Sequence, residues 1–337
     1  MHPTMQQVAQ QAGVSTALVS LVMRDAPNVS DHRRALVLAA ADALGYRPNV
    51  LARNLASRRT RTIGVVLNDL HNPFFAEIID SLQITADEGG YRLLIGNGRR
   101  SKRGEADAIE TFLQFRVDGL VMVGSVLAVS AMATAASSTA LIAVCRTTRN
   151  SALDTVNTDD VLGARLAVDH LVELGHERIA HIDGGGGGGA AARRRGYLAA
   201  MRDHGLEGRA VTVRGDYSEL GGFRAATSML EQHPVPTAIF AANDLSAVGA
   251  LDAAENAGLR VPHDVSIVGY DNTALAEMHH MSLTTINQPR DDLGRLAMEL
   301  LLQRLDDERT DAVHHVVAPS LVVRSTSARR PTTRGAR

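Results

Sequence analysis

The first 45 residues carry apolar side chains at the spacing of short α-helices. A capping-box pair followed by an apolar stripe predicts a helix over residues 5–12, from Thr4, Gln7, Val8 and Ala12. Gly13 ends this helix, and Ser15 can cap a second one, whose inward positions are Val19, Val22 and Met23. A helix, a tight glycine turn and a second helix together predict a helix-turn-helix motif.

A third helix is predicted over residues 31–44, with Ser30 as its cap and Gly45 as its end. Its inward face is assigned to five apolar residues, Ala35, Leu36, Ala39, Ala40 and Ala43. They would close a small three-helix core with four valines of the preceding segment, Val8, Val14, Val19 and Val22.

From residue 62 the pattern changes to continuous apolar runs, typical of strands buried on both faces, that alternate with helical stretches. Strands are expected at residues 62–67, 91–96, 119–123, 141–145, 178–182, 211–214, 238–240 and 266–270. Helices are expected at residues 74–89, 106–115, 127–137, 161–174, 191–204, 220–231 and 245–257. This alternation predicts βαβ units with right-handed crossovers. The expected fold is an all-α helix-turn-helix headpiece and an α/β body of two doubly wound parallel-sheet lobes.

Residues 46–60 join these two regions and differ from both. Pro48 can begin a short helix, but a helix of under three turns is marginal alone and needs a partner surface. Val50, Leu51 and Leu55 are flanked by arginines, a combination that suits the minor groove of DNA, where an apolar side chain can unstack a base step. Taken alone, the stretch could equally be an ordinary interdomain linker.

Charge is distributed unevenly along the 337 residues. Residues 1–61 hold eight arginines, no lysine and three aspartates, a net charge of +5 in a chain of net −2, so the remainder carries −7. A basic N-terminal module is the electrostatic footprint expected of a nucleic-acid-binding protein. The single cysteine, Cys145, excludes an internal disulfide. Without a signal-peptide pattern or an apolar run of membrane length, we expect a soluble, cytoplasmic protein with no membrane partner.

If the second helix enters the major groove, its outward N-terminal residues read base edges. Those residues are Thr16, Ala17, Ser20 and Leu21. Leu21 offers no hydrogen bond, so it can contact only a thymine methyl or another apolar edge. Polar residues near helix starts are expected at phosphates, namely Thr4, Ser15, Ser20, Asn28 and Ser30.

A second group of polar residues follows the predicted strands of the body, where the carboxyl ends of a parallel sheet form a ligand site. The candidates are Asp69, Asn72, Phe74, Cys145, Arg146, Arg193, Asn243 and Asp271. Amides, carboxylates and arginine with an aromatic ring suit a polyol such as a sugar, whose hydroxyls both donate and accept hydrogen bonds. Each Asx residue alone could instead cap a helix, and it is their convergence that favours a binding site.

The remaining motifs favour neither an enzyme nor a cofactor. The run Gly184 to Gly189 could cradle a phosphate, but it lacks the Lys-Ser/Thr of a P-loop. A flexible loop at the cleft mouth is therefore expected, with phosphosugar binding as the alternative. The histidines lack partners at zinc-like spacing and no GxSxG motif is present, so we expect neither a metal site nor a serine hydrolase.

The order and spacing of the N-terminal motifs resemble the headpiece and hinge of the lactose-repressor (LacI/GalR) family. The matching motifs are Gly13-Val14-Ser15, Asn28-Val29-Ser30, residues 44–49, Ala52-Arg53 and Leu55. The resemblance implies base reading at Thr16, Ala17 and Leu21. It also implies hinge contacts to DNA from Asn49, Ala52, Arg53 and Leu55, with Leu55 levered into the minor groove. Leu18 stands where the family usually has Thr and Leu21 where it usually has Arg, so the common arginine-to-guanine contact is absent.

The same resemblance implies a body like that of sugar-binding periplasmic proteins, with the ligand in a cleft between the lobes. The chain is then expected to cross between lobes three times, near Asp159, Asn287 and Pro319. Effector contacts are implied for Arg193, Asn243, Asp271 and the loop after the first strand. Cys145 stands where the family usually has Asp, so one hydroxyl acceptor is missing.

The expected organisation is a headpiece at residues 1–47, a hinge helix and linker at 48–60, a two-lobed effector-binding and dimerisation domain at 61–326 and a disordered tail at 327–337. Lobe 1 is expected at about residues 61–159 and 288–319, and lobe 2 at about 160–287 and 320–326.

The expected function is that of a homodimeric transcriptional regulator, a repressor of carbohydrate genes. Its partners would be double-stranded operator DNA, a second copy of the chain and a small carbohydrate effector that controls DNA binding. Two other classes share parts of the pattern. A sugar-binding transport component should have a signal peptide and no headpiece, and a nucleotide-dependent enzyme would use the glycine run.

Overall fold

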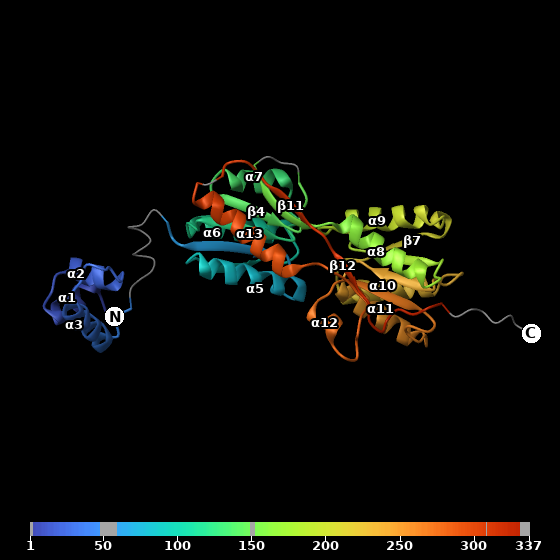
Figure 1. Cartoon of the computed structure of the whole chain (residues 1–337), viewed down its shortest axis with the longest axis horizontal. Helices are drawn as coiled ribbons and strands as arrows, with labels where there is room; N and C mark the ends of the chain where they lie inside the picture. The colour runs from blue at the N-terminus through green and yellow to red at the C-terminus, as the bar shows by residue number, and fades with distance from the viewer. Residues whose placement is uncertain (1–2, 48–58, 149–151, 308, 331–337) are drawn as a thin grey trace, which may run out of the picture. The chain divides into compact units, whose positions relative to one another are not determined.

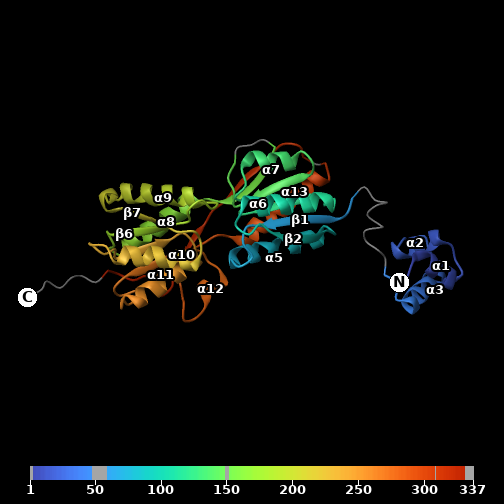
Figure 2. The same cartoon turned by 180° about the vertical axis from the view of Figure 1, so that it is seen from behind.

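The computed structural model describes residues 3–47, 59–148, 152–307 and 309–330. The chain divides into two compact units, residues 1–60 and residues 61–337 (Figures 1 and 2). Residues 48–58 of the expected hinge and residues 331–337 of the expected tail lie outside the described residues. The same holds for the hinge candidates Asn49, Ala52, Arg53 and Leu55.

The N-terminal unit is built from three capped helices, α1 (Met5–Ala12), α2 (Thr16–Met23) and α3 (Asp31–Leu44), which confirms the predicted headpiece elements. The Thr4 hydroxyl accepts from the Gln7 amide at 3.3 Å, while the Gln7 side chain accepts from the Thr4 amide at 2.8 Å. Gly13 ends α1 in the left-handed region at φ 65°, where a side chain would be strained. The chain can therefore turn directly into α2.

The predicted inward face of α3 was wrong. Ala35, Leu36, Ala39 and Ala43 are exposed, and the buried face consists of Val37, Ala40 and Ala41, with Leu44 packed against it. Residues 35–41 are apolar without interruption, so two helical faces matched the period equally well. Ser30 occupies the N-cap position but makes no side-chain cap hydrogen bond, which corrects its expected role as a capping side chain.

The first sheet of the body has six parallel strands in the order β11-β5-β4-β3-β1-β2. Their bounds are β1 Thr62–Leu67, β2 Arg92–Asn97, β3 Gly119–Val123, β4 Ala140–Val144, β5 Asp154–Thr158 and β11 His314–Val317. Four helices cover it, α5 Pro73–Glu88, α6 Lys102–Gln114, α7 Val129–Ala136 and α13 Arg290–Leu305.

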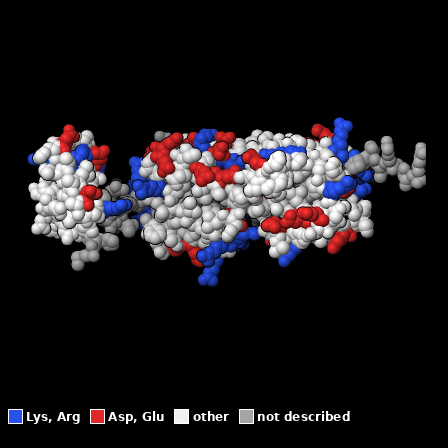
Figure 3. Space-filling model, turned by 90° about the horizontal axis from the view of Figure 1, so that it is seen from below, with Lys and Arg blue, Asp and Glu red and all other residues white. Residues whose placement is uncertain are grey.

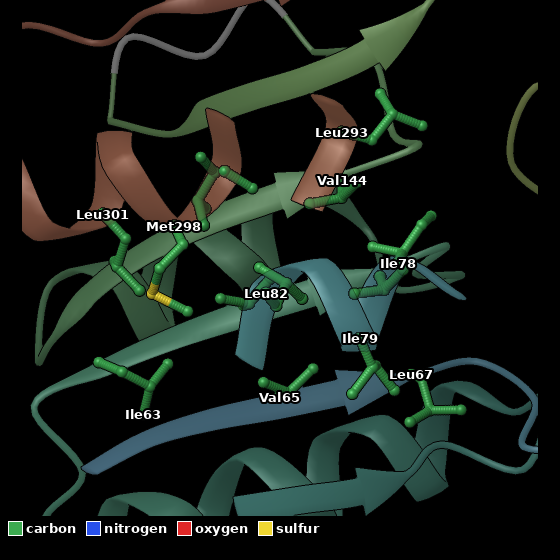
Figure 4. Close-up of a cluster of buried hydrophobic side chains, with 14 of the residues drawn as sticks. Ile63, Val65, Leu67, Ile78, Ile79, Leu82, Val144, Leu293, Met298 and Leu301 are labelled. Carbon is green, nitrogen blue, oxygen red and sulfur yellow. The ribbon is translucent and has the colours of Figure 1, made fainter. Parts of the chain in front are cut away.

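Both faces of this sheet are buried, as its continuous apolar runs predict. On one face, side chains of α5 and α13 meet Ile63, Val65 and Leu67 of β1 (Figure 4). On the other face, α6 and α7 pack against Val66 and Leu120. Successive residues of β1 thus serve opposite cores, and only its amino-terminal residue, Thr62, is half-buried.

The second sheet has the order β12-β10-β9-β8-β6-β7. Its strands are β6 Ile179–Asp183, β7 Val211–Arg214, β8 Ala238–Ala241, β9 Ser266–Asp271, β10 Thr285–Asn287 and β12 Ser320–Val322. Helices α8 (Asp160–Glu173) and α9 (Ala190–Asp203) cover one face, and α10 (Glu219–Leu230) and α11 (Asp244–Asn256) the other (Figure 1). Strand β12 runs antiparallel to β10, which departs from the expected purely parallel sheet. The short helices η1 (Glu207–Arg209) and α12 (Ala274–Glu277) lie in connections.

The chain passes between the two sheets three times, between β5 and α8, between β10 and α13, and between β11 and β12. Beyond β12 the chain remains attached to the second sheet. The Ala328 amide donates to the Ser266 hydroxyl at 3.1 Å, and the Arg330 amide donates to the Leu174 carbonyl at 2.9 Å. The disordered tail expected from residue 327 is therefore wrong for residues 327–330. No described helix combines the length and apolar character needed to cross a bilayer.

A buried carboxylate ties the first sheet to α13. Asp154 accepts from Arg304 Nε at 2.5 Å, from Arg309 Nη1 and Nη2 at 2.8 and 2.9 Å, and from the Val313 amide at 2.7 Å. Burial alone would raise the pKa of Asp154, but the hydrogen bonds from Arg309 and Arg304 outweigh burial and hold that pKa below its usual value.

We therefore expect Asp154→Asn to lower the free energy of unfolding by about 3–5 kcal/mol, because it leaves two arginines around an uncharged group. Urea unfolding followed by circular dichroism at pH 7 measures this loss. A carboxyl with a lowered folded pKa stabilises above its unfolded pKa of about 4 and loses that contribution as pH falls through the folded value. The difference between wild type and variant should therefore shrink in acid.

The control is Asp264→Asn, which removes a surface ion pair with Arg260 at 2.8 Å. Solvent screens this pair, so only a small change is expected. Equal losses in the two variants would contradict the structural role of Asp154.

Candidate ligand cleft and DNA-reading helix

A cavity of about 360 Å³ lies between the carboxyl ends of the two sheets. Seven of the eight ligand candidates line it, and these are Asp69, Asn72, Phe74, Cys145, Arg193, Asn243 and Asp271. The eighth, Arg146, is not brought to the cavity, because its Nη2 donates to the Leu127 carbonyl at 3.3 Å. These seven residues follow or end five separate strands, β1, β4, β6, β8 and β9, and meet around one space.

The Arg193 side chain is buried in the cavity wall and is 6% exposed. Its Nε donates to Asp160 Oδ1 at 2.8 Å, and Nη1 donates to the Ala242 carbonyl at 2.5 Å. The guanidinium lies 3.7 Å from the centre of the Tyr270 ring. Among the described residues Nη2 has no hydrogen bond, so a planar donor remains available to a ligand.

Asp271 ends β9 beside this arginine, with Oδ1 3.9 Å from Arg193 Nη1. Its Oδ1 accepts from Gln288 Nε2 at 2.6 Å, and its backbone is held at φ 121°. Burial raises the pKa of Asp271 well above its usual value, although the Arg193 charge acts in the opposite direction. The carboxyl oxygens can accept a hydrogen bond from a ligand hydroxyl.

The amide candidates have two roles, because each also caps the helix that follows it. Asn72 Oδ1 accepts from the Phe74 amide at 3.1 Å, and Asn243 Oδ1 accepts from the Ser246 amide at 2.9 Å. Asn243 Nδ2 donates to the Tyr217 carbonyl at 3.1 Å. Helix capping therefore fixes these side chains at the cavity wall, and it is compatible with a role in ligand binding.

Cys145 lies on the wall in the left-handed region, at φ 58°. Burial, followed by the nearby Asp160 charge, raises the pKa of this thiol. The side chain is therefore neutral and only weakly polar where a carboxylate was expected from the family pattern. This wall contributes little hydrogen bonding to a ligand.

Glycines 184–188 line the cavity, and Gly184 and Gly187 are packed against Tyr217. The Tyr217 hydroxyl donates to the Gly188 carbonyl at 2.7 Å. A Cβ on Gly184 or Gly187 would lie 2.1 or 2.4 Å from the Tyr217 ring, whereas a Cβ on Gly186 would meet nothing within 4 Å. Most of the glycine run is therefore required by close packing, which the expectation of a merely flexible loop did not include.

Several lining residues were missed from the sequence, namely Asn68, Phe75, Arg100, Lys102, Val126, Arg214, Asp216 and Tyr217. Arg100 and Lys102 follow β2, and Arg214 to Tyr217 end and follow β7. The rule that selected Asp69 and Asp271, polarity just after a strand, applies to these positions as well. Both strands lie at sheet edges, and their mixed polarity makes them less prominent as buried strands.

In the N-terminal unit, the outward face of α2 is accessible. Thr16, Ala17 and Leu21 are exposed, Leu21 by 39%, and Ser20 is half-buried. The Ser15 hydroxyl accepts from the Leu18 amide at 3.2 Å and caps α2, while the Thr4 hydroxyl belongs to the α1 capping box. Asn28 and Ser30 are exposed at the start of α3. Seen from the side shown in Figure 3, Lys and Arg are interspersed with Asp and Glu over the body.

Comparison with known proteins assigns both units. Residues 4–49 match the family described as bacterial regulatory proteins, lacI family, and residues 168–327 match a periplasmic binding protein-like domain. The HTH-type transcriptional repressor PurR of Erwinia tasmaniensis is 35% identical over 333 residues, 97% of this chain and 98% of that protein. The chain belongs to the LacI family.

Other members of the LacI family are similar over the same length. Catabolite control protein A of Priestia megaterium is 34% identical, covering 93% of this chain and 95% of that protein. Among solved structures, a lac repressor dimer bound to operator and the anti-inducer ONPF has a TM-score of 0.84 at 29% identity, covering 97% of this chain and 100% of that one. The LacI-family relatives are transcriptional repressors and not enzymes, in agreement with the expected class.

The glycine packing gives a direct test of the cavity wall. Gly187→Ala should lower the free energy of unfolding by about 1–3 kcal/mol, because the new methyl group displaces the Tyr217 ring. Gly186→Ala is the matched control and should be neutral or slightly stabilising, since it only restricts the unfolded chain. Thermal and urea unfolding of the full chain measure both. Indistinguishable variants would show that the ring does not pack on the loop.

Proposed function

We propose that the protein is a homodimeric, sequence-specific repressor of carbohydrate genes that binds operator DNA through α2. A small hydroxylated ligand in the cleft would change its operator affinity. The observation that carries the proposal is the arrangement of Asp69, Asn72 and Phe74 of one lobe around the same cavity as Arg193, Asn243 and Asp271 of the other. In a chain with a LacI-family headpiece, such a cavity is suited to control of DNA binding.

Relatives support the ligand class. Solved structures with 27–30% identity include a CelR–cellobiose complex, with a TM-score of 0.72, and a LacI-family regulator from Enterococcus faecium with bound ribose, also 0.72. Both ligands are polyols, for which the amides, carboxyls and Phe74 of this cavity are suitable partners. Repression of genes for carbohydrate use, in the cytoplasm where the operator is located, follows from this class.

Exposed apolar side chains support dimerisation. Ile84 on α5 is 63% exposed, and Ile95 on the neighbouring edge strand β2 is 51% exposed. Apolar groups gathered on adjacent surface elements are typical of a protein–protein interface. A two-fold dimer would present two copies of α2 to the two halves of a pseudo-palindromic operator.

The test is selection of binding sites from random double-stranded DNA by the full-length protein. The expected result is a pseudo-palindromic consensus bound with strong salt dependence, since phosphate contacts release counterions. Affinity that is indifferent to sequence and salt would overturn the proposal.

Leu21 gives a sharper prediction. Leu21→Arg should shift the selected sites towards a guanine at one position of each half-site, by about 1–3 kcal/mol of preference, because arginine hydrogen-bonds to both guanine acceptors. Leu36→Arg on α3 is the control, since Leu36 is 43% exposed and lies outside the base-reading face. If both variants select the wild-type consensus, α2 does not read the groove as proposed.

A further inference from the structure

Three cationic side chains surround the mouth of the cavity. Arg100 and Lys102 follow β2 on the first lobe, and Arg214 ends β7 on the second. All three are exposed, and the described residues offer none of them a carboxylate partner within ion-pair distance. Arg100 reaches across the cleft and donates to the main-chain carbonyl of Asp216. Positive charge therefore faces the same opening from both lobes.

The other charged groups of the cavity already have partners. Arg193 is paired with Asp160 and lies near Asp271. Asp69 Oδ1 accepts from the His71 amide at 2.9 Å, and Asp216 Oδ1 accepts from the Ser218 amide at 3.0 Å and from its hydroxyl. Burial would raise the pKa of Asp216, but the Ser218 hydrogen bonds and the Arg100 charge lower that pKa, so the charge of Arg100 is partly engaged by this carboxylate. Lys102 and Arg214, in contrast, have no carboxylate within ion-pair distance in the described part of the chain.

The glycine loop lies beside these cations. A Cβ on Gly185 would lie 3.6 Å from Arg214 Nε, which places the guanidinium against the loop. No hydrogen bond from the amides of Gly186 or Gly188 is found within the described part of the chain. Main-chain amides without side chains allow close approach of an anion and can donate to its oxygens.

The deeper part of the cavity has a different chemistry. Asn68 Oδ1 is buried there without a hydrogen-bond partner among the described residues, near Asp69 and Asn72. The polar side chains of Asn72, Asn243 and Asp271 line the same cavity and can exchange hydrogen bonds with ligand hydroxyls. The cavity therefore has a hydroxyl-binding interior and a cationic mouth.

We propose that the cleft is selective for a polyol that carries an oxyanion, a phosphate or a carboxylate, bound at the mouth between Arg214 on one lobe and Arg100 and Lys102 on the other. This inference rests on the proposed effector role of the cleft and narrows its ligand class. Charge-assisted hydrogen bonds from both walls favour the arrangement in which the lobes approach each other. A neutral sugar could occupy the interior but would leave the cations unpaired.

The experiment is calorimetric titration of the full-length protein with two matched sets of sugars. The first set is D-glucose, D-glucose 6-phosphate and D-glucuronate, and the second is D-ribose and D-ribose 5-phosphate. At least one anionic probe should bind about tenfold or more tightly than its neutral counterpart, and increasingly so at low salt. The phosphate and carboxylate probes distinguish the two oxyanions. Equal or tighter binding of the neutral sugars, or no binding by any anionic probe, would overturn the inference.

Variants locate the effect. Arg214→Gln and, on the opposite wall, Lys102→Gln should each weaken binding of the anionic probe about tenfold and leave the neutral counterpart unchanged. Arg195→Gln is the matched control, because Arg195 is exposed on α9 outside the cavity. Equal effects of Arg195→Gln and Arg214→Gln would show a general charge effect and contradict the proposed site.

Site selection on DNA separates this inference from the proposed function. If the protein selects an operator but prefers neutral sugars, the proposed function stands and the proposed anionic ligand is contradicted. If the protein binds the phosphorylated probe but selects no operator, the proposed function is contradicted.

Discussion

The cavity-facing edge of the second lobe depends on the contacts that hold the buried guanidinium of Arg193. An arginine that is 6% exposed is tolerated only with partners for its charge and donors. Those partners come from the start of α8, the end of β8 and the end of β9, through Asp160, the Ala242 carbonyl and Asp271. Tyr270 stacks on the guanidinium at 3.7 Å and donates to Asp160 at 3.1 Å. One cation therefore aligns three strand and helix ends that are distant in sequence.

This arrangement explains why small residues surround the site. A Cβ on Gly163 would lie 2.3 Å from the Tyr270 hydroxyl, and one on Gly189 would lie 2.7 Å from Asp160 Oδ2. The aromatic rings and carboxylates that hold Arg193 can approach it only because the neighbouring backbones carry no side chain. The glycine run has the same relation to Tyr217. Residues without chemistry of their own thus determine where the polar groups lie.

The elements of the fold could be predicted from local signals, since capping residues, glycine stops and continuous apolar runs act within one turn or one strand. Local signals failed where the sequence pattern fitted two arrangements equally well. On α3, seven consecutive apolar residues left the buried face undecided between Leu36 and Val37, and only packing against α1 and α2 selected Val37. In the cleft, Asp69 and Asp271 were recognisable because their strands are plainly apolar. Arg100 and Arg214 follow edge strands of mixed polarity, and their convergence depends on how the two sheets face each other.

The contact between the lobes also depends on residues that no local pattern reveals. Arg290 begins α13 just after a crossing, and its Nε pairs with Glu77 Oε2 on α5 at 2.5 Å while Nη1 donates to the carbonyls of Asp271 and Asn272. Glu77 Oε1 in turn accepts from the Ala274 amide of the second lobe at 3.1 Å. A rotation of one lobe against the other has to preserve or exchange the bonds of Arg290 and Glu77 together. Asp271, which takes part in them, also lines the cavity. The cavity and the lobe contact therefore share one strand end, so the position of Asp271 is coupled to the geometry between the lobes.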